Sequence, residues 1–249
     1  MSGHSKWANI QHRKGRQDER RGKVFAKLSR QLIVASREGG GDPGTNAKLR
    51  TVMEEARAAE MPKDRIEHAI KRGTGEIEGS SFEASIYEGY GPAGVAMLID
   101  VLTDNSQRSV SDVRSIMRRH GGSLGAPGCV TWMFEQKGVI VLSKEAAAED
   151  ALFALAVEAG AEELREEDGS WEVFTAPGDF AAVAEALREA GLAPERAELT
   201  MVPSSTTAVP DAEAPKLIRL LDELNDHDDV QQVYANFEIS DEAMERLAG

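Results

Sequence analysis

Apolar residues recur at helical spacing over residues 16–37. Placed on a helix at about 100° per residue, Phe25, Leu28, Leu32 and Ala35 lie on one stripe. A second stripe, well separated from the first, consists of five basic residues: Arg16, Arg20, Lys23, Lys27 and Arg30. The pattern predicts an amphipathic helix that buries the apolar stripe and leaves this second stripe, the basic ridge, facing solvent.

Two shorter helices are expected after the glycine-rich loop at 39–44. Asn46 can cap a helix that runs to about Ala59, and Pro62 fits the first turn of another that ends at Gly73. The apolar positions expected inside this small bundle are Leu49, Val52, Met53, Ala56, Ile66, Ala69 and Ile70.

Strands then alternate with helices beyond a linker at 73–81. A helix is expected to begin at Asp104 and Asn105 and to stop at Gly121. The strands are expected at 95–102, 130–134, 139–142, 171–175, 197–202 and 230–237, and the other helices at 145–159, 179–190 and 214–224. In the strand at 130–134, Val130, Trp132 and Phe134 would share one face.

These elements predict a mixed α/β (α+β) protein in which a three-helix domain precedes two small α/β sandwich domains. The segment 138–203 reads as a self-sufficient βαβαβ unit inserted into the second domain. The expected boundaries are therefore 1–76 for the helical domain, 77–137 plus 204–249 for the middle domain, and 138–203 for the inserted one.

Charge is distributed unevenly along the chain. The total net charge is −14, which by itself argues against a nucleic-acid partner. Residues 1–73, however, hold 17 Lys and Arg against 9 Asp and Glu, a net of +8, and the remainder holds 12 against 34, a net of −22. A protein with a basic head (residues 1–73) and an acidic body (the remainder) can bind a polyanion through the head, while the body repels it.

The basic head also includes residues that precede the first helix. Lys6, His12, Arg13 and Lys14 add cations and imidazole donors upstream of the ridge. Trp7 can stack on a base, or it can pack this segment onto the helices. Long cationic side chains at this spacing can reach successive phosphates, so we expect the head to bind a nucleic-acid backbone. The alternative is a lysine- and arginine-rich solvated face without a partner.

A second anion contact is expected where the strand at 95–102 runs into the next helix. Backbone N–H groups and the helix dipole favour an anion there. Asn105, Arg108, Arg114 and Arg118 would supply the polar and basic groups in an otherwise acidic body. Simple capping of the helix explains the same residues equally well.

Three other motifs do not support a catalytic or metal site. The run 89–94 matches G-x-G-x-x-G, but a strand follows it where a dinucleotide site needs a helix, so a β-hairpin or a turn at the entry to a strand is the better interpretation. The run 226–229 (Asp-His-Asp-Asp) lacks the ligand spacing of a calcium loop, and turn formation explains it. Cys129 precedes an apolar strand and is expected to be a small core residue.

Other features limit the class of protein. No apolar run approaches the roughly 20 residues that span a bilayer, and the polar N-terminus does not resemble a secretory signal. A single cysteine rules out an internal disulfide and suits a reducing compartment. We therefore expect a cytoplasmic protein that uses no metal or cofactor and has no membrane partner. The sequence leaves the oligomeric state open, with a monomer favoured.

Several separated motifs resemble the YebC/PmpR family, which is labelled as probable transcriptional regulators and includes mitochondrial translational activators. They are 3–7 (GHSKW) with Asn9, Ile10 and 12–14, then 87–92 (YEGYGP), 103–105 (TDN) with Arg108, 132–134 (WMF) and 225–231 (NDHDDVQ). Gln11 and Ala93 depart from the family pattern, which usually has Lys and Gly there. The resemblance implies a helical N-terminal domain plus two α/β domains, and a protein that is not an enzyme.

The expected function is therefore regulation of gene expression through a nucleic acid. The basic ridge would bind phosphate groups and would not discriminate between DNA and RNA. The sequence shows no helix with a set of side chains that could read base edges. Structured RNA or the ribosome fits this pattern at least as well as DNA, so a translation factor is favoured over a sequence-selective transcriptional regulator. A nucleotide-binding enzyme that uses the 89–94 turn and a protein-only adaptor are the remaining alternatives.

Overall fold

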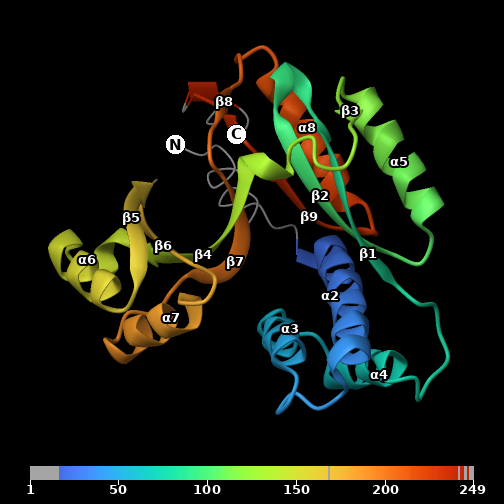
Figure 1. The fold of residues 1–249 in the computed structure, drawn as a ribbon, viewed down its shortest axis with the longest axis horizontal. Helices are drawn as coiled ribbons and strands as arrows, with labels where there is room; N and C mark the ends of the chain where they lie inside the picture. Colours follow the sequence, from blue (N-terminus) through green and yellow to red (C-terminus); the bar gives the residue numbers. More distant parts are fainter. Residues whose placement is uncertain (1–16, 168, 241, 244–245, 247–249) are drawn as a thin grey trace.

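The computed structural model describes residues 17–167, 169–240, 242–243 and 246, with side chains from Arg21 onward. Its first part is a bundle of three helices, which are α2 (Gln17–Gly39), α3 (Ala47–Ala58) and α4 (Lys63–Gly73) (Figure 1). The apolar stripe of α2 is buried as predicted, as are most of the apolar positions expected in α3 and α4.

The start of α3 shows why the sequence places a helix there. The side-chain oxygen of Asn46 accepts a hydrogen bond from the backbone N–H of Leu49 at 3.0 Å, which satisfies one of the unpaired donors of the first turn. The amide nitrogen of Asn46 donates to the carbonyl oxygens of Ala35 and Gly40, both at 2.8 Å. One side chain therefore caps α3 and ties it to the end of α2.

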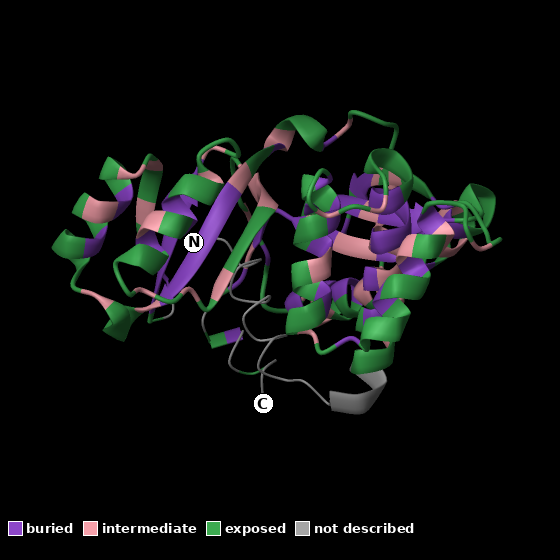
Figure 2. Cartoon of the chain, turned by 90° about the horizontal axis from the view of Figure 1, so that it is seen from below, coloured by how far each residue is buried: buried purple, intermediate pink, exposed green. Residues whose placement is uncertain are grey.

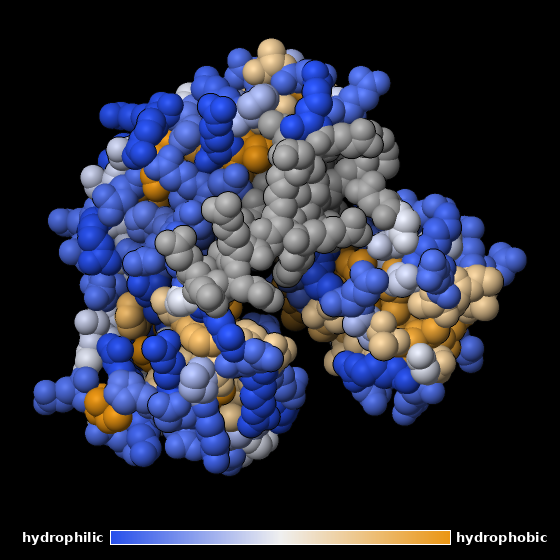
Figure 3. Space-filling model, turned by 180° about the vertical axis from the view of Figure 1, so that it is seen from behind, coloured by the Kyte–Doolittle hydropathy of each residue, from blue (hydrophilic) through white to orange (hydrophobic). Residues whose placement is uncertain are grey.

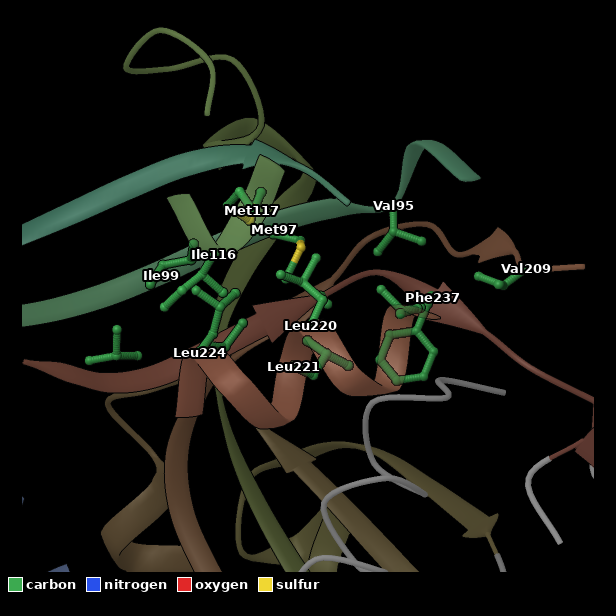
Figure 4. Packing of buried hydrophobic residues seen from close by; sticks show 14 of the residues in the cluster. Val95, Met97, Ile99, Ile116, Met117, Val209, Leu220, Leu221, Leu224 and Phe237 are labelled. Carbon is green, nitrogen blue, oxygen red and sulfur yellow. The ribbon is translucent and has the colours of Figure 1, made fainter. Parts of the chain in front are cut away.

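The second part is a four-stranded antiparallel sheet in the order β3-β1-β2-β9. Its strands are β1 (Glu83–Tyr90), β2 (Ala96–Thr103), β3 (Ser123–Leu124) and β9 (Val230–Ala235). Two helices, α5 (Ser106–Arg119) and α8 (Ala214–Asp226), pack against one face. Figure 4 shows this core, where Met97 and Ile99 of β2 face Leu220 and Leu224 of α8.

The third part is a second antiparallel sheet in the order β5-β6-β4-β7. Its elements are β4 (Phe134–Ser143), α6 (Glu149–Glu158), β5 (Ala161–Glu167), β6 (Ser170–Thr175), α7 (Phe180–Glu189) and β7 (Arg196–Pro203). This βαββαβ order is that of the ferredoxin-like arrangement. Figure 2 shows buried positions along its strands and exposed positions on the outer sides of its helices.

The remaining elements are short. Three 3-10 turns occur at Pro92–Gly94, Thr131–Met133 and Lys144–Ala146. The strands β8 (Thr207–Ala208) and β10 (Phe237–Glu238) pair in parallel. The strand β9 pairs with β2 in the first sheet, although β4–β7 lie between them in the chain. The segment that forms the second sheet is therefore an insertion between two strands of the first sheet.

The structure differs from the predicted elements in its strands, and one strand crosses an expected domain boundary. The expected strand at 130–134 is a 3-10 turn at Thr131–Met133, which then enters β4. The second sheet contains an additional strand, β5, and the first contains β1, neither of which was predicted from the sequence. The expected boundary between 137 and 138 lies inside the continuous strand β4.

The helical bundle is packed onto the first sheet. Phe82, just before β1, and Leu102 of β2 belong to the same buried cluster as Leu32 and Leu49 of the bundle. Figure 1 shows α2 below the strands of the first sheet, with the second sheet to one side. This packing brings the basic stripe of α2 close to the segment between α8 and β9.

Candidate nucleic-acid interface

The described part of the basic ridge contacts residues 225–231, which join α8 to β9. Lys23 forms an ion pair with Asp226, with its Nζ 3.2 Å from Oδ1. Lys27 donates through Nζ to the backbone carbonyl of Asn225 at 2.8 Å and to that of Gln231 at 3.4 Å. These contacts join residues about 200 positions apart in the chain.

Arg30 reaches deeper into the same segment. Its guanidinium donates to the carbonyl oxygen of Asp228, and its Nη2 lies 3.4 Å from Oδ1 of Asp229. The guanidinium carbon also lies 5.7 Å from the centre of the Phe82 ring, within the range of a cation–π contact. The expectation that the ridge faces solvent is therefore wrong for Lys27 and Arg30, whose charged ends hold the bundle against the middle of the molecule.

Asp229 connects three parts of the chain at this contact. Its carboxylate, 3% exposed, accepts hydrogen bonds from Thr103 Oγ1 at 3.0 Å, Ser109 Oγ at 2.5 Å and Arg108 Nη2 at 2.9 Å. Burial alone would raise the pKa of Asp229, but the hydrogen bonds from Arg108, Ser109 and Thr103 outweigh burial and lower it. The carboxylate is therefore held in its charged form between the end of β2, the start of α5 and Arg30.

Lys27 is the other titratable group that the contact perturbs. Burial against the 225–231 segment lowers the pKa of Lys27 to about 8, and the nearby charge of Asp226 opposes this effect only in part. The amine is thus poorly solvated when charged. A group in this environment is suited to an internal contact and is less available to a phosphate than an exposed lysine.

Four residues were expected to form a second anion contact, and two of them, Asn105 and Arg108, bind other groups of the protein instead. The Asn105 side chain caps α5 by accepting from the backbone N–H of Arg108 at 3.0 Å. The Arg108 guanidinium donates to Asp104 at 3.0 Å as well as to Asp229. Arg114 and Arg118 lie exposed on α5. Helix capping, the simpler of the two sequence interpretations, therefore accounts for Asn105.

Much of the expected interface lies outside the described residues. This applies to Lys6, Trp7, His12, Arg13, Lys14 and Arg16, and to the side chain of Arg20. Arg21, the first described side chain of α2, forms an ion pair with Glu60 of the bundle, with Nη2 2.6 Å from Oε2. Its guanidinium also lies 5.7 Å from the Phe25 ring, so its stem covers the apolar stripe.

The turn at 89–94 joins two antiparallel strands, as its sequence context predicts. Tyr90 ends β1, and β2 begins at Ala96. A dinucleotide site needs a helix after the glycines, and here a 3-10 turn and a strand follow. Ala93 adopts φ 58° and ψ 16°, the left-handed conformation in which glycine is usual.

A rigid loop before β4 presents a surface that the sequence analysis did not identify. Trp132 is 74% exposed, and its indole N–H donates to the carbonyl of Cys129 at 3.1 Å. The Tyr90 hydroxyl donates to the same carbonyl at 3.2 Å. The 126–128 run of Ala, Pro and Gly, typical of a turn, was the signal that Trp132 is not in a strand.

The buried carboxylate of Glu88 holds this loop in place. It accepts hydrogen bonds from the backbone N–H groups of Gly128 at 2.5 Å, Val130 at 2.8 Å and Thr131 at 2.9 Å. Burial would raise the pKa of Glu88, but these hydrogen bonds lower it to about 2. Cys129 is partly buried beside it, and burial raises the pKa of its thiol.

The structure gives no support to a metal site in the 226–229 run. Asp226 pairs with Lys23, and Asp229 is surrounded by donors. Among the residues that the structure describes, no group of three or more His, Cys, Asp or Glu side chains is arranged to hold a metal ion. None of the described helices has both the length and the apolar character needed to cross a membrane.

Comparison with known families covers almost the whole chain. The model of the TACO1/YebC N-terminal domain matches residues 5–76, and the model of the TACO1/YebC second and third domain matches residues 82–237. The chain belongs to the TACO1/YebC family. The resemblance drawn from the sequence motifs is thereby confirmed.

Relatives of similar length are known in this family. A protein of Syntrophotalea carbinolica is 51% identical over 249 residues, covering 100% of both chains, and one of Geobacter sulfurreducens is 51% identical over 247 residues, covering 99% of this chain and 100% of the relative. Both are named probable transcriptional regulatory proteins. The crystal structure of the conserved hypothetical protein Aq1575 from Aquifex aeolicus is 45% identical, with a TM-score of 0.80 over 90% of this chain and 93% of that one.

Proposed function

We propose that this TACO1/YebC-family chain is a non-enzymatic, cytoplasmic regulator of gene expression that binds nucleic acid through its basic N-terminal segment. The observation that carries the proposal is the separation of charge, with a net of +8 over residues 1–73 and −22 over the rest. The regulatory names of the relatives agree with this class of function. An acidic body beside a basic head limits where a polyanion can dock.

The proposed interface is the cationic stretch from Lys6 to Lys23. It comprises Lys6, Trp7, His12, Arg13, Lys14, Arg16, Arg20 and Lys23. Lys23 is half-buried and its partner Asp226 is exposed, so a phosphate can replace that partner. Lys27 and Arg30 are assigned to the internal contact instead, because releasing them leaves buried hydrogen-bonding groups without partners.

Structured RNA or the ribosome is the target that we favour. The described helices offer no set of Asn, Gln and Arg side chains projecting together for insertion into a major groove. A cationic segment without base-reading side chains binds the phosphate backbone and recognises shape. The acidic body is in addition compatible with the basic proteins that surround ribosomal RNA.

The second candidate is a sequence-selective DNA-binding transcriptional regulator, which the names of the relatives favour. Arg114 and Arg118, exposed on α5, are a further basic surface for such a contact. A nucleotide-binding enzyme and a protein-only adaptor rank lower, since the 89–94 turn lacks the geometry of a phosphate site and the adaptor leaves the basic head without a role.

Co-sedimentation with ribosomes, run beside a DNA mobility shift, separates the two candidates. The test variant carries Arg13, Arg16, Arg20 and Lys14 changed to Gln. The matched control carries four exposed cations of the body and bundle changed to Gln: Arg57, Lys63, Lys71 and Arg188. We expect the wild type and the control to co-sediment with ribosomes and the test variant to be lost from the pellet. Sequence-selective DNA binding without ribosome association would instead establish the transcriptional candidate.

A further inference from the structure

A pocket of about 550 Å³ lies between the helical bundle and the first sheet. It is lined by α2 and α3 on one side and by β1 and β2 on the other. Val34, Val52, Ile86 and Leu102 form an apolar wall. The volume is that of a typical ligand site, and Ile86 is 59% exposed within the described structure, unusual for an isoleucine on a sheet.

Carboxylates from the three parts of the chain face this region. Glu55 of α3 and Asp100 of β2 line the pocket itself. Burial raises the pKa of Glu55, and the negative charge of Glu198 of β7, in the second sheet, raises it further. Figure 3 shows the lobe of the bundle and the lobe of the second sheet with a hollow between them.

Few of these charges are neutralised by the protein. Lys48, which also lines the pocket, pairs with Glu38 outside it, with Nζ 2.7 Å from Oε2, and Glu198 has Arg196 at 3.5 Å. For Glu55 and Asp100, no ion pair is formed with any cation in the described part of the chain. Asp100 has a hydrogen bond from Tyr234, and burial raises the pKa of the Asp100 carboxyl.

We propose that this pocket binds a basic and partly apolar peptide segment of a partner protein. An aliphatic side chain of the segment packs against Val34, Val52 and Ile86, and a neighbouring lysine or arginine pairs with Asp100 and Glu55. Charge complementarity selects this occupant, because Glu55 and Asp100 line the pocket without an ion pair to a described cation, and the negative charge of Glu198 acts on Glu55. The same carboxylates repel a nucleic-acid backbone, so the pocket selects a different partner from the cationic stretch Lys6 to Lys23.

A peptide is favoured over a small organic cation by the arrangement of the carboxylates. They come from α3, β2 and β7, so an occupant that contacts all of them must extend from the pocket into the hollow between the lobes. An extended chain with alternating side chains can place an apolar group on one side and a cation on the other.

The test uses fluorescently labelled synthetic peptides and the full-length protein. One peptide alternates lysine and valine, a second alternates glutamate and valine, and a third alternates lysine and serine. We expect the lysine–valine peptide to bind at least about tenfold more tightly than either of the others. Changing both Glu55→Gln and Asp100→Asn should weaken its binding by about three- to tenfold, and Ile86→Ser should weaken it without affecting the lysine–serine peptide.

Matched controls keep the charge change but leave the pocket intact. Glu54→Gln on α3 and Glu83→Gln on β1, the strand that pairs with β2, remove exposed carboxylates near those of the pocket. Loss of binding in this control pair as large as in the pocket pair would show a non-specific acidic surface and overturn the proposal. So would equal affinity for the glutamate–valine peptide, or unchanged binding by the pocket variants.

A further variant distinguishes a partner from the chain's own basic segment. If neutralising Arg13, Lys14, Arg16 and Arg20 tightens binding of the lysine–valine peptide by about tenfold or more, that segment is the normal occupant of the pocket, and the partner proposal fails. We expect an affinity within about twofold of the wild type. Unfolding by urea, compared for all variants, verifies that each one is folded.

Discussion

Ala93 occupies a backbone conformation that ordinarily favours glycine. Its φ of 58° places the Cβ too close to the following carbonyl, at a cost of roughly 1–2 kcal/mol in the left-handed region. The tight turn between Tyr90 and Ala96 requires this conformation, because β1 and β2 pair directly on either side of it. The departure from the family's usual glycine therefore leaves strain in the hairpin.

We predict that Ala93→Gly stabilises the protein by about 0.5–1 kcal/mol. The relief of strain exceeds the additional entropy that glycine gives to the unfolded chain. The measurement is the free energy of unfolding in urea. Ala154→Gly, an exposed position in the middle of α6, is the control and should destabilise by about 1 kcal/mol. A destabilised Ala93→Gly variant would contradict the account of this turn.

Glu88 gives a pH dependence with a defined sign. Its pKa is about 2 in the folded protein and about 4.5 in the unfolded chain. A folded pKa below the unfolded one means that the charged carboxylate stabilises the fold above pH 4.5, and that this contribution is lost as the pH falls from 4.5 towards 2. The loss follows from protonation of the acceptor of three backbone N–H groups.

We predict that Glu88→Gln costs roughly 1.5–3 kcal/mol at pH 7, the value for hydrogen bonds to a charged group. The difference from the wild type should shrink as the pH falls from 4.5 towards 2. Unfolding by urea at several pH values measures this difference. The fluorescence of exposed Trp132 reports on the loop separately. A difference that stays constant down to pH 2.5 would show that Glu88 does not hold the loop by its charge.

At the scale of elements, Asp229 is the point where β2, α5 and α2 are joined. Its nearly buried carboxylate receives donors from the first two and faces Arg30 of the third. Removing the charge of Asp229 leaves Arg30 without its carboxylate partner and Arg108 with Asp104 alone. The neighbouring Asp228 is exposed and contributes only its backbone carbonyl to Arg30.

We predict that Asp229→Asn destabilises the protein by about 3–5 kcal/mol, whereas Asp228→Asn changes the stability by less than about 0.5 kcal/mol. Thermal and urea unfolding of both variants provide the comparison. Similar effects in the two variants would mean that the contact depends on the backbone of the segment and not on the Asp229 carboxylate.

Elements with a strong local signal were predictable from the sequence. The helix α2 has a complete apolar stripe, and Asn46 marks the start of α3, so both were predicted to within a few residues. The strand β5 was not, because its sequence AEELREE is mostly charged and reads as a loop. It forms because it is an edge strand that pairs only with β6, and such strands often carry charged residues.

The turn at Thr131–Met133 shows a different limit. The alternation of Val130, Trp132 and Phe134 is a correct strand pattern, yet Glu88 binds the backbone N–H groups of Val130 and Thr131 that a sheet would otherwise use. The residue responsible lies more than 40 positions earlier in the chain. The hydrophobic periodicity of a short segment carries no information about a hydrogen-bond partner so distant in the sequence.

Across the whole molecule, the distribution of charge was predictable from the sequence, but the ion pairs that the charges form were not. Lys27, Arg30 and the acidic run at 226–229 each read as solvated when taken alone. The fold brings them together because Phe82 and Leu102 attach the bundle to the first sheet. The basic surface of the candidate site is consequently smaller than the sequence indicated, and it lies towards the start of α2 and the residues before it.

The salt dependence of nucleic-acid binding can show whether the basic ridge is divided between a nucleic-acid interface and an internal contact. Binding of a structured RNA is measured at several salt concentrations for the wild type, for Arg13, Lys14, Arg16 and Arg20 changed to Gln, and for Lys27→Gln. Each lost phosphate contact lowers the slope of log K against log salt by roughly 0.7–0.9. We predict a slope lower by about 3 in the four-site variant and unchanged in Lys27→Gln. An unchanged slope in the four-site variant, or a slope about one unit lower in Lys27→Gln, would contradict the account.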